Sequence, residues 1–175
     1  MPQPSNLLKK LTGGDRRSIG QSNDVAALVL KQPHLFGELI HGQRAADPLV
    51  RMRAADAAEK VSRKQPELLR PFKRELMHLL EETSEQELRW HLAQMVPRLP
   101  LTTKERLRAT AAFRRYLGDR SSIVKTCAMQ ALADIAAKDE SLLLETKALL
   151  QESMKSGTAA MKARGRKLLQ RFEER

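Results

Sequence analysis

Three side chains near residue 38 have the spacing of a small metal site. His34, Glu38 and His41 stand at positions i, i+4 and i+7, which on one α-helix places two imidazoles and a carboxylate on the same face. Such ligands suit Zn²⁺ or another divalent metal. Gly37 and Gly42 weaken this helix, however, and the sequence offers no further ligand nearby. We therefore expect no metal and no other cofactor.

Residues that could support covalent catalysis are sparse. The single cysteine, Cys127, falls in an apolar helical pattern, where packing explains it better than nucleophilic chemistry does. One cysteine excludes an internal disulfide framework and favours a reducing compartment, so we expect a cytoplasmic location. The stretch GGDRRSIG from Gly13 resembles a phosphate-binding loop only superficially, because no Lys-Ser or Lys-Thr follows its glycines. The sequence therefore predicts a protein that is not an enzyme.

Basic residues outnumber acidic ones across the chain. Its 32 Lys and Arg residues against 21 Asp and Glu residues give a formal charge of +11. Such a balance favours acidic partners, namely nucleic acid, an anionic protein surface or anionic lipid. No apolar run approaches the ~20 residues of a membrane span, so we expect none.

The elements that position these residues are predicted to be helices that repeat. Apolar content is 41% but aromatic content only 3%, and β-branched residues are few. Four segments align at steps of 38, 36 and 37 residues, starting at Val50, Leu88, Val124 and Met161. Five columns of this alignment are apolar or small and form one helical stripe. The columns are Val50/Leu88/Val124/Met161, Ala54/Leu92/Ala128/Gly165, Ala57/Met95/Ala131/Leu168, Ala58/Val96/Leu132/Leu169 and Val61/Leu99/Ile135/Phe172.

Each copy continues into a second helix. Two apolar columns of this helix repeat at 37 residues, Leu76/Phe113/Leu150 and Leu80/Leu117/Met154. A further copy upstream starts with a helix predicted over 24–31, capped by Ser22 or Asn23. Pro97 should kink the first helix of its copy. Three other prolines mark breaks between paired helices, Pro33, Pro66 and Pro100.

The repeating unit is therefore a helical hairpin of about 37 residues, present four times with a half-unit at the C-terminal end. One hairpin cannot bury its stripe alone, so neighbouring hairpins must stack. We predict a flexible basic lead-in over 1–21 and a single repeat domain over 22–175.

The segment DPLVRMRAADAAEKV from Asp47 resembles the first helix of a HEAT repeat in its acidic residue, Val-Arg pair and alanines. SSIVKTCAMQALADIA from Ser121 is the next best match. The resemblance covers roughly 22–175 and implies an all-α, right-handed solenoid with an ARM-type fold. HEAT proteins mostly serve as binding surfaces and scaffolds. Some are enzymes, such as the HEAT-like alkylpurine DNA glycosylases and the di-iron deoxyhypusine hydroxylases, but this chain lacks the aromatic residues of the former and the His-Glu dipeptides of the latter.

A basic column follows the first apolar column. Its members are Arg51, Arg89, Lys125 and Lys162. Stacked helices lie ~8–10 Å apart, so the column could form a basic ladder along one edge. Alternatively, these residues pair with acidic neighbours of the adjacent repeat such as Asp47 or Glu85, as in the families that this chain resembles.

A second basic group lies on the predicted helix TKERLRATAAFRRYL. Lys104, Arg108 and Arg115 share one face of it and have no basic counterparts in the neighbouring copies. In HEAT-like solenoids the second helices line the concave face, where such a strip could bind a partner. An ordinary solvated charged face is the alternative.

The only tryptophan is the remaining candidate for a contact. Trp90 shares a repeat column with Met52, about 200° round the helix from the apolar stripe. An exposed Trp beside an exposed Met would be a plausible anchor. Equally, Trp90 could pack against a neighbouring helix.

The sequence thus predicts a non-catalytic repeat protein that binds a protein partner, with an acidic surface as the best match to its charge. The alternative is a module that binds nucleic acid regardless of sequence. The partner, the pathway and the oligomeric state do not follow from the sequence.

Overall fold

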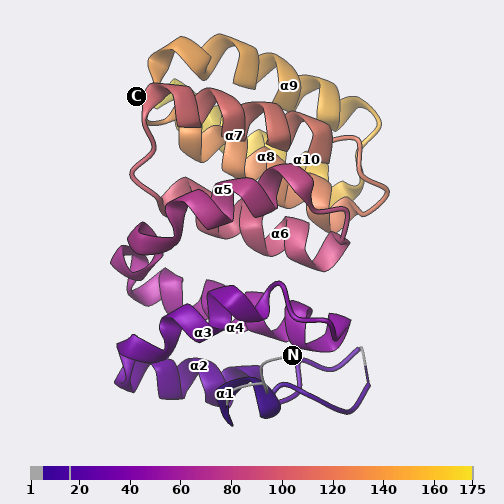
Figure 1. The fold of residues 1–175 in the computed structure, drawn as a ribbon. Coiled ribbons are helices and arrows are strands. Elements are labelled where there is room, and N and C mark those ends of the chain that lie inside the picture. The colour runs from indigo at the N-terminus through magenta and orange to yellow at the C-terminus, as the bar shows by residue number, and fades with distance from the viewer. Residues whose placement is uncertain (1–5, 16, 175) are drawn as a thin grey trace. The chain divides into compact units, whose positions relative to one another are not determined.

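The computed structural model describes residues 6–15 and 17–174. In these ranges every regular element is a helix, and no helix among them is long and apolar enough to cross a membrane. The chain divides into two compact units, Met1–His78 and Leu79–Arg175. The predicted all-helical fold class is therefore confirmed (Figure 1).

The first unit is built around α4. Its α-helices are α1 (Asn6–Lys9), α2 (Ser22–Lys31), α3 (Phe36–Gly42) and α4 (Pro48–Lys64), with 3₁₀ turns at Pro33–Leu35 and Pro66–Phe72. Both α2 and α3 pack against α4. Helix α5 (Lys73–Glu82) begins in this unit and ends in the next.

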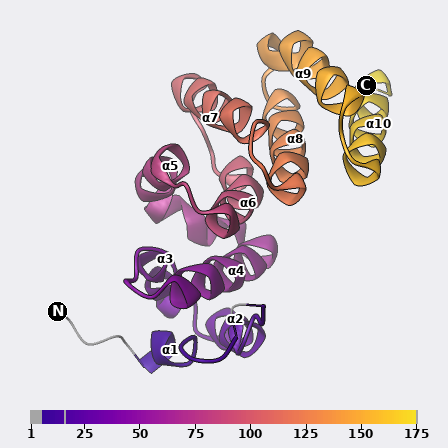
Figure 2. The same ribbon diagram turned by 90° about the vertical axis from the view of Figure 1, so that its right-hand side faces the viewer.

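The second unit arranges its helices in two rows. Its α-helices are α6 (Gln86–Met95), α7 (Thr103–Tyr116), α8 (Ser122–Ala136), α9 (Leu143–Lys155) and α10 (Ala159–Glu173), with 3₁₀ turns at Val96–Arg98 and Glu140–Leu142. Helix α8 packs against α6 on one side and α10 on the other, and α7 and α9 also pack on α8. Figure 2 shows α6, α8 and α10 in one row and α7 and α9 in the other.

Local capping fixes where several helices begin. The Asp47 side chain accepts a hydrogen bond from the Leu49 amide at 2.8 Å, and Pro48 occupies the first turn of α4, as the sequence predicts. Helix α7 begins with a capping box, in which Thr102 and Glu105 each accept the other's backbone N–H. These caps set the start of α4 and α7 independently of the packing between helices.

The predicted cap of α2 is wrong. The helix begins at Ser22, and its N-cap residue Gln21 makes no side-chain hydrogen bond to the helix. The two residues predicted to cap it contact α4 instead: the Ser22 hydroxyl donates to Asp56, and the Asn23 Oδ1 accepts from Lys60 at 2.6 Å. The two side chains that N-cap preferences assign to the start of α2 therefore bind α4 instead.

Pro97 interrupts the first helix of its copy, as predicted, but it ends the α-helix rather than kinking it. Helix α6 ends at Met95, and the chain continues as the 3₁₀ turn Val96–Arg98. Proline lacks an N–H and clashes with the preceding helical turn, so here it ends the α-helix.

The apolar stripe predicted from the repeat is buried. Every member of the five first-helix columns is buried except Leu169 of the last copy, which is half-buried. In the second helices Leu76, Phe113 and Leu150 are buried, whereas Leu117 and Met154 are half-buried. The repeat alignment therefore identified the core-facing side of these helices.

Residues about one repeat apart in sequence also contact each other. In the first unit, Asp56 bonds Ser22 and Lys60 bonds Asn23, at separations of 34 and 37 residues. The second unit has three such pairs, at separations of 30, 34 and 37 residues: Arg89–Asp119, Arg164–Gln130 and Arg171–Asp134. Within each unit, equivalent helices of consecutive copies thus lie next to each other.

Arg53 of α4 connects the N-terminal segment to the first unit. Its side chain is only 1% exposed. The guanidinium donates hydrogen bonds of 2.6–3.1 Å to four backbone carbonyls, those of Leu11, Gly13, Asp15 and Ser18. Gly20 has φ +53°, and a Cβ there would lie 2.9 Å from the Arg53 Cζ, so the turn requires glycine. The described part of the predicted flexible lead-in is therefore held against α4.

Candidate interface on helices α7 and α9

Two exposed leucines occupy equivalent positions on α7 and α9. Leu107 is 53% exposed and Leu144 is 83% exposed, and 37 residues separate them, which is one repeat. A single exposed leucine needs no explanation. Two at the same repeat position are notable, because each lies on the outer row of helices and neither is used by the core.

An exposed alanine lies on the same side of each helix as its leucine. Ala111 and Ala148 are exposed, are again 37 residues apart, and follow the two leucines by four residues. Residues at i and i+4 lie on the same side of a helix. We call Leu107, Ala111, Leu144 and Ala148 the α7/α9 face.

A pocket lies between the C-terminal halves of the same helices. Its volume is about 430 Å³. Its lining residues are Arg114, Leu117, Gly118, Leu149, Glu152, Ser153 and Ser156. Leu117 and Leu149 are its half-buried apolar residues, and the charged or polar Arg114, Glu152, Ser153 and Ser156 form most of the rest. Arg114 pairs with Glu145 of α9 at 2.6 Å, so this ion pair bridges the two helices that form the pocket.

The basic strip predicted on α7 flanks this face. Arg108 makes a bidentate pair with Glu81 of α5 through two 2.8 Å bonds, and Arg115 donates to the Glu81 backbone carbonyl at 3.2 Å. The hydrogen bond and the charge of Glu81 raise the pKa of Arg108. Lys104 is exposed and lies on the same side by helical spacing. We call Lys104, Arg108 and Arg115 the basic row, which lies on the side of α7 nearer to α5.

The basic column predicted on the first helices has mixed surroundings. Arg51 donates to the carbonyls of Ala45 and Ala46 in the preceding turn, at 2.7 and 2.8 Å. Arg89 pairs with Asp119 at 2.6 Å, a carboxylate that the sequence did not suggest as its partner. The two lysines of the column differ in exposure, since Lys125 is half-buried and Lys162 is exposed. The two arginines thus contact groups of their own units.

The Arg89–Asp119 pair is partly withdrawn from water. The Asp119 side chain is 3% exposed and that of Arg89 26%. Burial by itself raises the pKa of the Asp119 carboxyl, but the Ser121 amide and the Arg89 guanidinium both donate hydrogen bonds to it. Their combined effect, with the positive charge of Arg89, leaves this pKa below its ordinary value.

The lowered pKa predicts a loss of stability in acid. An Asp whose pKa is lower in the folded state stabilises the fold fully above its unfolded pKa of ~3.9, and this contribution disappears as the pH falls through the folded pKa. We expect Asp119→Asn to be less stable than the parent at pH 7, with the difference shrinking below about pH 4. Thermal melts between neutral and acidic pH test this, with the exposed Asp24→Asn as control. A difference that does not vary with pH would contradict it.

The two residues of the predicted aromatic anchor lie in different units. Trp90 is half-buried on α6, and its ring meets the buried His91 ring at a centroid distance of 5.6 Å. Met52 is half-buried on α4. Each therefore has some exposed surface within its own unit.

The three residues with metal-site spacing were expected on one helix, and the structure divides them between a 3₁₀ turn and α3. His34 lies in the 3₁₀ turn that Pro33 begins, whereas Glu38 and His41 lie on α3. The His41 Nε2 lies 3.9 Å from a Glu75 carboxylate oxygen. In the part of the chain that the structure describes, no group of three His, Cys, Asp or Glu residues could hold a metal ion.

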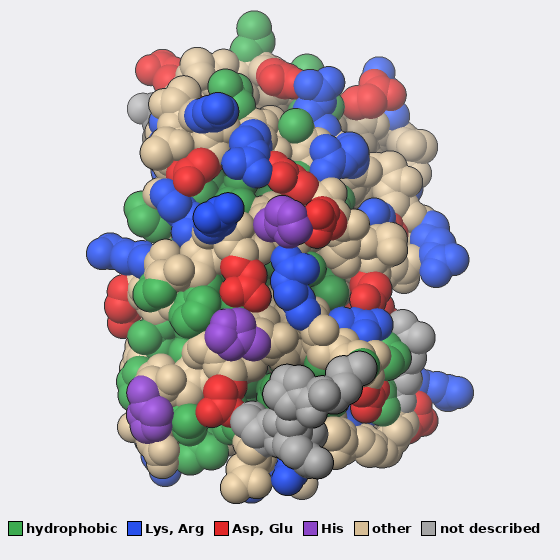
Figure 3. Space-filling model, in the orientation of Figure 1, with side chains coloured by type: hydrophobic (Ala, Val, Ile, Leu, Met, Phe, Trp, Pro, Cys, Tyr) green, Lys and Arg blue, Asp and Glu red, His purple; other side chains and the backbone are tan. Residues whose placement is uncertain are grey.

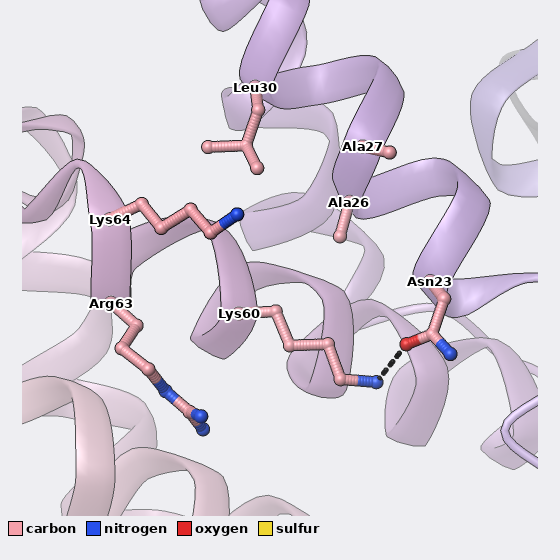
Figure 4. A pocket seen from close by; sticks show the side chains of 7 residues that line it. All are labelled: Asn23, Ala26, Ala27, Leu30, Lys60, Arg63 and Lys64. Atoms are coloured by element: carbon pink, nitrogen blue, oxygen red, sulfur yellow. Dashed lines mark hydrogen bonds between the residues drawn. The ribbon is translucent and has the colours of Figure 1, made fainter.

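A second pocket, of about 260 Å³, lies between α2 and α4 (Figure 4). Its lining residues are Asn23, Ala26, Ala27, Leu30, Lys60, Arg63 and Lys64. Lys60 binds Asn23 at 2.6 Å and Asp56 at 2.5 Å, and Arg63 pairs with Glu59 at 2.7 Å. Carboxylates of α4 thus compensate two of the three cations, which makes this pocket a weaker anion site than its lining suggests.

Charges of both signs are also mixed on the surface. On the face shown in Figure 3, Asp and Glu side chains lie among the Lys and Arg side chains. The excess positive charge is therefore not gathered into one uninterrupted patch on that face.

The α7/α9 face was not among the sites predicted from the sequence. Its signal was present, because Leu107 and Leu144 are one repeat apart, as are Ala111 and Ala148. These positions lie on the polar side of the second helices, outside the core columns, and the preceding copy has Arg70 and Arg74 there. No protein-family model matches this chain, and no curated protein matches it.

Proposed function

We propose that this protein is a non-catalytic, HEAT-like repeat module that binds a protein partner through the α7/α9 face. The observation that supports this most is the exposure of Leu107 and Leu144 at one repeat position, at 53% and 83%. Exposed apolar surface with a polar rim is characteristic of protein-binding sites. The proposal includes a cytoplasmic location, which suits the half-buried thiol of Cys127.

The HEAT-like solenoid is part of this proposal. Its support is the packing of α2 on α4 and of α8 on both α6 and α10, which are first helices of consecutive copies. The hydrogen bonds between residues 30–37 positions apart have the spacing that stacked repeats require. Second helices then form a separate row, and α7 and α9 present their outer sides for binding.

A protein partner suits this face better than nucleic acid does. Phosphate backbones are bound by Lys and Arg side chains that are free to reach them. In the basic row, Arg108 and Arg115 already contact Glu81, and the adjoining surface is apolar. Leucine and alanine side chains contribute to contacts with other proteins by becoming buried there.

Affinity capture from a cell lysate, with and without nuclease, tests the proposal. The baits are the parent protein, the double variant Leu107→Ser/Leu144→Ser, and Ile123→Ser as a control. Ile123 is 54% exposed but lies on α8. We expect the parent and Ile123→Ser to capture the same protein despite nuclease, and the double variant to lose it. Equal capture by all three baits would contradict the proposal.

If the protein instead binds nucleic acid, the same purified protein should bind oligonucleotides with an affinity that depends on salt. The support for this alternative is the charge of +11. If about four basic residues neutralise phosphates, the logarithm of affinity should fall with log salt at a slope of about −3.6, or roughly a hundredfold between ~50 and ~200 mM. Fluorescence anisotropy with unrelated oligonucleotides measures this slope. Capture that nuclease abolishes, together with such a slope, would favour the alternative over a protein partner.

A further inference from the structure

We infer that α10 binds double-stranded DNA through its phosphate backbones, with little dependence on base sequence. Four exposed cations support this inference, and we call them the α10 surface: Lys162, Arg164, Arg166 and Lys167. Helix α10 lies at the end of the row of α6 and α8, whereas the α7/α9 face belongs to the other row (Figure 2). DNA binding is therefore a further function on a separate surface, in addition to the proposed protein contact.

The charged residues of α10 have one sign over most of its length. From Ala159 to Phe172 the helix contains five basic residues and no acidic one, and carboxylates follow only at its end. Helix α9, which packs beside it, contains two acidic and two basic residues. A helix that needs only to be soluble can mix both signs as α9 does, so solubility alone does not explain the composition of α10.

The cations of the α10 surface have no carboxylate partner in the part of the chain that the structure describes. Within 6–15 and 17–174, Lys162, Arg166 and Lys167 make no hydrogen bond or ion pair. Arg164 donates to the neutral side-chain carbonyl of Gln130 at 2.6 Å and keeps its full charge. Other arginines of the same unit pair with carboxylates at 2.6–3.0 Å, namely Arg89–Asp119, Arg106–Asp139, Arg108–Glu81, Arg114–Glu145 and Arg171–Asp134.

These charges oppose the electrostatic preferences of a helix. The N-terminal end of a helix dipole is positive and favours acidic side chains, yet the first turn of α10 has none and Lys162 follows it directly. Like charges at i and i+4, as at Lys162 and Arg166, also destabilise a helix. Charges that lower stability and compensate no acidic group of the fold are expected where a protein binds a ligand of opposite charge.

The four cations lie on opposite flanks of the exposed side of α10. By helical spacing, Lys162 and Arg166 lie on one flank, and Arg164 and Lys167 lie on the other. The exposed positions between the flanks are small or uncharged, namely Ala159, Ala163 and Gln170. A helix with its side chains is ~10–12 Å wide and the major groove of B-DNA is about 12 Å wide. Such a helix can therefore lie at the groove with one flank toward the phosphates of each strand.

Other anionic macromolecules suit this surface less well. Proteins that bind single strands place aromatic side chains against the bases, whereas the one aromatic residue of α10, Phe172, is only 6% exposed. The major groove of duplex RNA is too narrow for side chains to enter. Protein interfaces have an apolar core inside a polar rim, and the α10 surface has only alanines between its cations. Duplex DNA requires only suitably spaced cations.

Fluorescence anisotropy of a labelled DNA duplex with the full chain tests this inference. If the four cations each neutralise a phosphate, the logarithm of affinity should fall with log salt at a slope of about −3.6. Duplexes of unrelated sequence should bind equally. Lys162→Ala/Arg166→Ala should weaken binding at ~50 mM salt by about tenfold or more and reduce the slope to about −1.8, because two of the four contacts are lost.

Lys64→Ala/Arg74→Ala is the matched control, since it removes two exposed cations from the first unit. It should leave the slope unchanged and weaken binding by less than about threefold, through net charge alone. Thermal melts complete the comparison. The α10 double variant should melt no lower than the parent, because alanine favours helix and the like-charge pair is removed. A clearly lower melting temperature would instead assign the two cations to the stability of the fold.

Several results would overturn the inference. They are undetectable duplex binding at ~50 mM salt, equal weakening by the two double variants, and binding of a single strand as tight as that of the duplex. Poly-glutamate that binds as tightly as the duplex would assign the α10 surface to acidic proteins. None of these results concerns capture through Leu107 and Leu144, so the proposed function is decided by its own experiment.

Discussion

Arg53→Met should lower the free energy of unfolding by about 2–5 kcal/mol, because it removes several hydrogen bonds to a charged group, each worth ~1.5–3 kcal/mol, and is offset only in part by the lower cost of burying a neutral side chain. The Arg53 guanidinium is buried and donates to four carbonyls of the segment Leu11–Ser18. Hydrogen bonds that involve a charged group are stronger than neutral ones, and carbonyls left buried without donors are costly. The loss should therefore exceed that of an ordinary surface substitution by several fold.

Arg53→Lys should lower the free energy of unfolding by an intermediate amount. The lysine ammonium keeps the charge but is too compact to reach all the carbonyls that the planar guanidinium reaches. Lys64→Met, which removes an exposed cation from the same helix, should cost less than about 0.5 kcal/mol. Denaturant unfolding followed by far-ultraviolet circular dichroism suits the measurement, since Trp90 lies in the other unit. A loss under about 1 kcal/mol for Arg53→Met would show that water replaces the guanidinium at these carbonyls.

Leu132→Ala should cost about 2–5 kcal/mol. Leu132 is 1% exposed on α8, which packs against α6, α7, α9 and α10. Removing its terminal carbons leaves a cavity that neighbouring helices fill only partly. This cost is a large share of the ~5–15 kcal/mol that stabilises a typical domain.

Leu144→Ala provides the matched control, as the same substitution at an 83% exposed leucine. It should change stability by less than about 0.5 kcal/mol. Tryptophan fluorescence follows both variants, because Trp90 is in the same unit as both leucines. Similar losses at the two positions would contradict the assignment of Leu132 to the core and of Leu144 to the exposed surface.

The sequence predicts the core of this fold well because the same apolar pattern occurs in four aligned copies. One helix with apolar positions such as Ala54 and Ala58 says little, but four aligned copies define one buried stripe. Pro33 and Pro66 likewise begin turns as expected, because proline acts through local backbone geometry.

Features that depend on the backbone of another segment could not be predicted in this way. The role of Arg53 requires a loop in which Gly13, Gly14 and Gly20 adopt positive φ and the Gly13 carbonyl accepts a hydrogen bond from the guanidinium. The ion pair of Arg108 with Glu81 joins residues 27 positions apart on different helices. Neither the columns of the repeat alignment nor the spacing of residues along one helix indicates such contacts between segments.

The candidate site was predicted only in part. Lys104, Arg108 and Arg115 were identified because neighbouring copies lack basic residues there. Leu107 and Leu144 were not predicted, because the property that distinguishes them is their exposure in the folded chain and not their residue type. The predicted charged strip and Leu107 thus lie on the same helix, α7.

Hydrogen–deuterium exchange of the protein with and without its captured partner tests the proposed α7/α9 interface most directly. Exchange reports every helix at once and does not depend on a chosen substitution. We predict slower exchange on partner binding in α7 and α9, over Thr103–Tyr116 and Leu143–Lys155, with little change in α2 and α10. Protection confined to α2 and α4, or spread over the first helices while α7 and α9 exchange as before, would contradict the proposed interface.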